Sequence, residues 1–154
     1  MRLSVILLTV MLLAFPAMAG LATGQSNVDS ITNDLDSLKY QLNDFSNKVE
    51  SELTDMNVLD NSLSSGNTKI SSESVDVKSI AEKADNRADG YDRQLSSLEK
   101  SLWTTQSRYN PGKFSNKEAT SIESRISAIQ GEIDRTRKMI GDMRVSADRI
   151  GHRL

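Results

Sequence analysis

The residue types that carry out chemistry in enzymes are scarce in this chain and are not grouped along it. It has 154 residues with one histidine and no cysteine, which excludes thiol nucleophiles, zinc-thiolate sites and disulfides. His152 stands near the carboxyl end of an expected helix, where the helix dipole favours a positive charge. Asp85, Asp89 and Asp92 have the spacing of any solvated helix face, and residues 85–90 lack the ligand pattern of an EF-hand loop. We expect no catalytic residue, no metal site and no cofactor.

Known catalytic and nucleic-acid-binding patterns are also missing from the sequence. It contains no glycine-rich phosphate loop, no G-x-S-x-G and no H-E-x-x-H motif. Arg135, Arg137 and Lys138 form a small basic patch, but the formal net charge of the chain is −2, which disfavours binding to nucleic acid. We interpret the patch as part of a solvated face. The sequence predicts a protein that is not an enzyme and that binds no nucleic acid.

One aromatic cluster is a candidate binding feature. Trp103, Tyr109 and Phe114 lie within twelve residues of one another, and Trp103 follows Leu102, so it stands beside the apolar stripe of its helix. Two interpretations are open at this point. Trp103 covers the end of a helical bundle over Phe114, or the three aromatics form a tip that docks a partner, since Trp and Tyr are frequent anchors of protein interfaces.

The elements that carry these residues are predicted by apolar periodicity. Apolar residues recur at alternating steps of three and four, the heptad pattern of packed amphipathic helices. In the first segment ten of eleven such positions are apolar, with Glu52 as the exception. No segment alternates with the period of two that strands require. The sequence therefore predicts an all-α fold with three long helices, at about residues 26–63, 71–109 and 116–154.

Two short stretches separate these helices. The Pro-Gly pair at 111–112 predicts a turn, and Ser115 with Glu118 forms an S-x-x-E capping box that starts the last helix. The Gly-Asn pair at 66–67 is a weaker turn signal. A continuous helix through residues 64–73 is the alternative there, because serine is tolerated inside helices.

Helices of similar length predict an antiparallel three-helix bundle. Folding the chain back at both turns sets Leu42 against Tyr91 and brings Asp85 near Arg137. A heptad pattern fits equally well any register that is shifted by one repeat. The layout is similar in outline to spectrin-like bundles, a resemblance that implies no functional residue.

Charge and side-chain type bear on how the helices associate. Residues 26–63 carry a net charge of −6 and residues 110–154 a net charge of +3, so we expect these parallel neighbours to attract each other. The alternative architecture is a helical hairpin or rod within an oligomeric coiled coil. It is suggested by isoleucines at both apolar heptad positions, a pattern that favours three or more strands: Ile122, Ile126, Ile129 and Ile133.

The amino-terminal residues predict export. Residues 1–19 have a basic start, an apolar run too short to span a bilayer and an A-x-A site, and we interpret them as a cleaved signal peptide. Residues 20–25 then form a short linker, and residues 26–154 form a single helical coiled-coil domain. We expect a secreted protein, extracellular or in a bacterial periplasm, with no stable membrane anchor.

The functional expectation is a structural or protein-interaction module. It would bind a protein partner, or associate with itself through its heptad faces. The alternative is a secreted carrier of lipid or of a small apolar ligand, whose helices would open like a hinge at Gly66 or Gly112.

Overall fold

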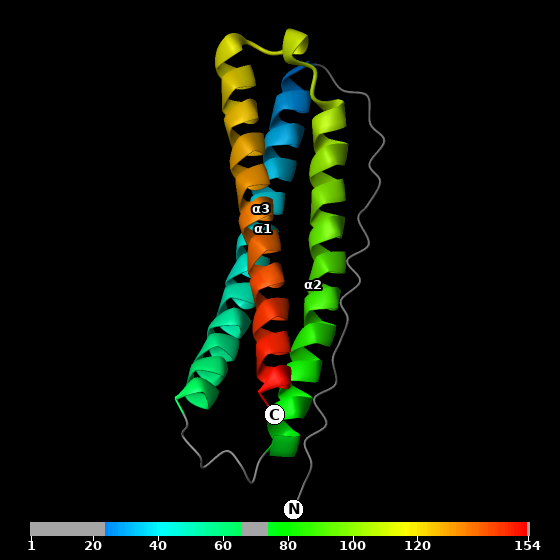
Figure 1. The fold of residues 1–154 in the computed structure, drawn as a ribbon. Coiled ribbons are helices and arrows are strands. Elements are labelled where there is room, and N and C mark those ends of the chain that lie inside the picture. Colours follow the sequence, from blue (N-terminus) through cyan, green and yellow to red (C-terminus); the bar gives the residue numbers. More distant parts are fainter. Residues whose placement is uncertain (1–23, 66–73, 154) are drawn as a thin grey trace, which may run out of the picture.

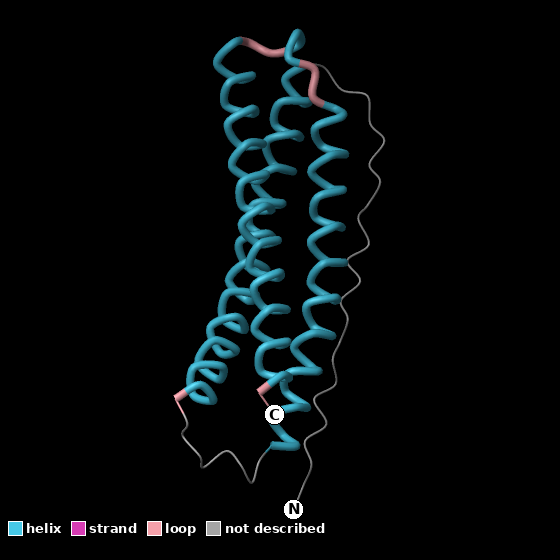
Figure 2. The backbone as a smooth tube through the Cα atoms, in the orientation of Figure 1, coloured by secondary structure: helices cyan, strands magenta, loops and turns pink. Residues whose placement is uncertain are grey.

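Three long helices lie side by side in the structure, a computed structural model that describes residues 24–65 and 74–153 (Figure 1). They are α1 (Gly24–Ser64), α2 (Ser74–Arg108) and α3 (Asn116–His152), and a short 3-10 helix, η2 (Pro111–Lys113), precedes α3. The helix α2 runs antiparallel to α1 and α3 (Figure 2). The predicted all-α antiparallel three-helix bundle is confirmed. The predicted signal peptide and the Gly-Asn turn at 66–67 lie outside the described residues.

The core is the heptad stripe of each helix. Leu35, Val49, Ala88 and Ile140 have no exposed surface, and the neighbouring stripe residues are nearly as buried. The stripe of α2 includes small side chains that face larger residues of the neighbouring helices: Ala81, Ala84 and Ala88. The isoleucines of α3 that suggested an oligomeric rod are buried within the single chain: Ile122, Ile126, Ile129 and Ile133.

Opposite charges join the two parallel helices, as the sequence predicts. The guanidinium of Arg125 on α3 forms an ion pair with Asp36 on α1, and Arg135 pairs with Glu50 at 3.2 Å. These four side chains are substantially exposed, so each pair contributes little free energy by itself. Their effect is to favour the parallel contact of an acidic helix with a basic one.

The register of α2 against α3 differs from the predicted one. Arg137 contacts Glu99 at 2.7 Å and so does not lie near Asp85. Further along, Arg144 contacts Asp89 at 2.7 Å. Glu99 lies 14 residues beyond Asp85 along α2, so α2 is displaced along α3 by one to two heptads from its predicted position. The connection between the two helices accounts for this displacement, because it extends past the carboxyl end of α2 before α3 begins (Figure 1).

The contact between α2 and α1 shows a displacement in the same sense. The Tyr91 ring packs edge-on against Phe45, with centroids 5.5 Å apart, and its hydroxyl donates a hydrogen bond to Glu52 at 2.6 Å. Tyr91 therefore points away from Leu42, its predicted partner. Burial of the phenol and its bond to Glu52 both raise the pKa of Tyr91, so the hydroxyl remains a donor. Glu52, the one polar position in the first heptad run, thus accepts a hydrogen bond that joins α1 to α2.

The start of α3 matches the predicted capping box. The Ser115 hydroxyl accepts a hydrogen bond from the backbone N–H of Glu118, and the Glu118 carboxylate accepts one from the backbone N–H of Ser115 at 2.9 Å. Two donors that a helix start leaves unpaired are thereby satisfied. Just before it, the Asn110 side chain accepts from the N–H of Gly112 and closes the Pro-Gly turn.

Removing this cap has a measurable cost. We expect Ser115→Ala to lower the free energy of unfolding by about 1 kcal/mol, because a backbone donor loses its partner. The hydrogen bonds from Ser115 also lower the pKa of Glu118, so this stabilisation is present above the unfolded pKa and is lost as the pH falls through the folded pKa. Urea unfolding of both proteins between pH 3 and 7 tests this, and a difference that stays constant with pH contradicts it.

In the part of the chain that the structure describes, no helix has an apolar run long enough to cross a membrane.

Candidate functional site

The three predicted aromatics separate into two places. Tyr109 and Phe114 stack with ring centroids 5.4 Å apart and planes inclined by 17°. The Tyr109 hydroxyl donates to the Glu123 carboxylate at 3.0 Å and lies 3.3 Å from the backbone oxygen of Ala119. This half-buried pair closes the turn between α2 and α3, so its role is to hold the bundle end together.

Trp103 does not cover Phe114, and the interpretation of Trp103 as a cap over the bundle end is wrong. Its side chain is 67 % exposed, on the flank of α2 below the turn. The cap is formed by Tyr109 instead, because the connection between the helices folds back over that residue. Trp103 is left facing solvent, which is costly for a large apolar ring unless something covers it.

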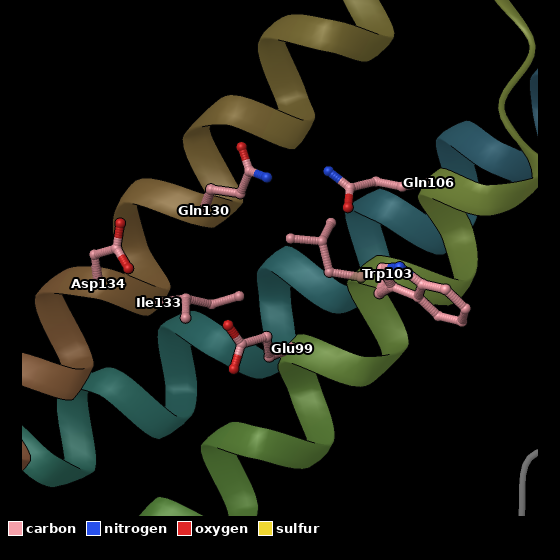
Figure 3. A pocket seen from close by; sticks show the side chains of 7 residues that line it. Glu99, Trp103, Gln106, Gln130, Ile133 and Asp134 are labelled. Atoms are coloured by element: carbon pink, nitrogen blue, oxygen red, sulfur yellow. The ribbon is translucent and has the colours of Figure 1, made fainter.

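The exposed indole lies at the rim of a groove between α2 and α3 (Figure 3). Leu102 and Ile133 supply its apolar floor, and Gln106 and Gln130 point toward each other from opposite helices. The groove has a volume of about 340 Å³. We call it the Trp103 groove, and its lining residues are Glu99, Leu102, Trp103, Gln106, Gln130, Ile133 and Asp134.

The lower end of the groove is closed by one cation between two acids. Arg137 contacts Glu99 at 2.7 Å and Asp134 at 3.3 Å. A guanidinium shared by two carboxylates neutralises only one of them. The cluster therefore keeps one negative charge at the mouth of the Trp103 groove.

The same arrangement recurs further along the α2–α3 contact. Arg144 lies between Asp89 at 2.7 Å and Asp92 at 2.5 Å, and its hydrogen bonds to them, led by the one to Asp89, raise the pKa of its guanidinium. Arg144 also lines a second hollow of about 230 Å³, which has Ala81 and Ala147 among its other lining residues.

Together the two hollows and the clusters between them form one acidic surface. We call it the acidic α2/α3 face. It holds seven carboxylates and three basic groups, a net charge of −4: Glu82, Asp85, Asp89, Asp92, Glu99, Asp134 and Asp148, with Lys78, Arg137 and Arg144.

The side chains of this surface include groups that can bind a ligand. Within residues 24–65 and 74–153, no three His, Asp or Glu side chains are grouped as a metal site requires. The only histidine, His152, is well exposed and lies 3.3 Å from Asp148, one turn earlier on α3. Amides, carboxylates and an exposed indole recognise a ligand through hydrogen bonds and contact area.

Sequence reasoning identified Trp103 but not the groove beside it. On α2, residues 99, 103 and 106 share a helix face, which the spacing alone indicates. Gln130 and Asp134 could not be found in this way, because their place opposite Trp103 depends on the register between α2 and α3. No residue type in the groove marks it as a site in the sequence.

Comparisons of this chain with protein-family models, with curated proteins and with solved structures found no match.

Proposed function

We propose that the protein is a secreted, non-enzymatic protein-interaction module that presents its outer helical surface to a partner. The observation that supports this most strongly is the exposure of Trp103, 67 % of whose surface is open to solvent beside a groove. Tryptophan is among the residues most enriched at the energetic centres of interfaces. The proposal that the protein is exported rests on the sequence of residues 1–19.

Packing within the chain indicates which surface a partner would use. The heptad stripes of the three helices are buried against each other, so they serve the fold of the single chain. A carrier of lipid would have to separate these helices to expose an apolar face. A partner that docks on the outside needs no such opening, and we therefore favour it over the lipid carrier.

The test is site-specific photo-crosslinking from a position near Trp103. A photoreactive amino acid replaces Ser107, one turn beyond Trp103 on α2. The secreted variant is then irradiated in the extracellular medium of the cells that produce it. We expect a crosslink to a distinct protein, and we expect Trp103→Ala to weaken binding by about 30-fold or more, the effect of losing an interface hot spot.

Tyr40→Ala is the matched control, because Tyr40 is an aromatic that is 77 % exposed on α1. Both substitutions should leave thermal unfolding unchanged, and Tyr40→Ala should leave the crosslink unchanged. A crosslink that survives Trp103→Ala, or no crosslink to any protein, argues against the proposal. Helicity that rises only when lipid vesicles are added points to the lipid carrier instead.

A further inference from the structure

We propose that the acidic α2/α3 face, with the Trp103 groove at one end, docks a basic amphipathic helix of a partner protein. This inference rests on the proposed function and names the kind of partner that this surface fits. Its three supports are the shape of the face, its charge and the position of the exposed indole.

The shape is a furrow between two neighbouring helices, in which two hollows are separated by the ion pairs of Arg137 and Arg144. α1 packs against the other side of the α2–α3 pair: Arg125 and Arg135 reach α1, whereas Arg137 and Arg144 reach α2. The furrow therefore remains uncovered in the single chain. Its floor is apolar at both hollows, and it extends from Lys78 to Gln106 on α2, about 40 Å at the rise of an α-helix.

A helix is the element that fits such a furrow. A fourth helix laid between α2 and α3 would insert its side chains into the two hollows, as helices pack in four-helix bundles. Gly141 lies between Arg137 and Arg144 on α3 and adds no side chain to the furrow, and a Cβ built on it would meet nothing within 4 Å. Trp103, at the rim of one hollow, would cover the flank of the docked helix.

The charge of the face indicates that the docked partner helix is basic. The face has a net charge of −4, and Arg137 and Arg144 are already occupied by two carboxylates each. Glu82 and Asp85 line the second hollow and form no ion pair with any described residue. Lysines or arginines on the flanks of a docked helix would pair with these free carboxylates.

A second copy of this chain does not meet that requirement. The segment that forms α1 is strongly acidic, with a net charge of −6 over residues 26–63, and would be repelled by the face. Five arginines of α3 are already paired with α1 or α2: Arg125, Arg135, Arg137, Arg144 and Arg149. This leaves only Lys117 and Lys138 as unpaired cations among the described residues of α3. Nucleic acid and anionic lipid surfaces would be repelled as well. The face thus selects a basic partner from outside the chain.

The chain carries its own reporter for this interaction, because Trp103 is its only tryptophan. Two synthetic, tryptophan-free amphipathic peptides of about 28 residues, long enough to span the furrow, serve as probes. Both peptides have the same stripe of leucines, and they differ only in the residues that flank it, which are lysines in one peptide and glutamates in the other. We expect the lysine peptide to shift Trp103 emission to shorter wavelength, with an affinity at least ~10-fold above that of the glutamate peptide and weaker in high salt.

Two double variants distinguish binding at the acidic α2/α3 face from non-specific attraction of a basic peptide to an acidic protein. Glu82→Gln with Asp85→Asn removes two charges from the face without breaking an ion pair, and we expect it to reduce lysine-peptide affinity about 5-fold or more. Asp44→Asn with Asp55→Asn makes the same charge change on exposed positions of α1 and should have little effect. Equal losses in the two double variants would overturn the inference.

The remaining outcomes are equally decisive. The proposal of a basic helix as partner would be overturned if the lysine peptide causes no emission shift or if both peptides bind equally. It would also be overturned if Trp103 emission shifts without peptide when sedimentation shows that the chain associates with itself. If crosslinks from Ser107 to a native protein persist in that case, the interaction module stands and only its partner class is wrong. If both experiments fail, the proposed function fails too.

Discussion

Replacing Ile140 with alanine should lower the free energy of unfolding by about 2–5 kcal/mol. Ile140 has no exposed surface and lies in the second half of α3, where the helix faces both neighbours. Alanine forms helix at least as readily as isoleucine, so the loss reports packing and not helix propensity. Domains of this kind are stable by roughly 5–15 kcal/mol in total, so the shift of a guanidinium unfolding curve, followed by circular dichroism, should be large.

Val145→Ala provides the control on the same helix. Val145 is 54 % exposed, so its truncation should change the stability by no more than about 0.5 kcal/mol. The Ile140→Ala midpoint should also be independent of protein concentration, because the stripe is buried inside one chain. A midpoint that moves with concentration would instead indicate that Ile140 packs against other copies.

The fold class and the helix ends were predictable because their causes are local. Periodicity alone identifies the helices, and the capping box at Ser115 and Glu118 fixes the start of α3 through backbone hydrogen bonds within four residues. The end of α2 at Arg108 follows from the Pro-Gly turn that comes soon after it. Each of these signals acts over a few residues, so neighbouring sequence suffices to show it.

The register was not predictable, because a heptad stripe repeats. Sliding α2 by seven residues keeps every apolar position facing the core, so the free energies of the two registers differ only in details such as side-chain size and the length of the connection. The position of the Trp103 groove depends on that choice. Gln130 and Asp134 are opposite Trp103 only in the observed register, and for this reason the groove could not be inferred.

Divergence of the helices also escaped prediction. α1 leans away from α2 toward its carboxyl end (Figure 1), and there Leu59 and Leu63 are only half-buried although they continue the heptad. Asp60, between them, is 6 % exposed and turns toward α3, where it lies 3.6 Å from Arg149 and 3.1 Å from Arg153. A heptad pattern does not show where one helix diverges from its neighbour, because the point of divergence depends on how the side chains of all three helices pack together.

Phe45→Ala should lower the free energy of unfolding by about 3–5 kcal/mol. Phe45 is 3 % exposed, and its ring meets Tyr91 edge-on at an interplanar angle of 73°. The substitution removes both a large buried area and the aromatic contact that joins α1 to α2. Equilibrium unfolding in guanidinium measures the loss, and a value below about 1 kcal/mol would show that the ring is not enclosed as described.

The same substitution decides the register when it is combined with changes at Tyr91. In a double-mutant cycle, Phe45→Ala and Tyr91→Ala should couple by about 0.5–1.5 kcal/mol beyond additivity, the range for edge-on aromatic pairs. Leu42→Ala should couple more weakly to Tyr91, because the Tyr91 hydroxyl reaches Glu52, on the opposite side of Phe45 from Leu42. Stronger coupling to Leu42 than to Phe45 would contradict the observed position of Tyr91 and favour the register of α2 against α1 that the sequence predicts.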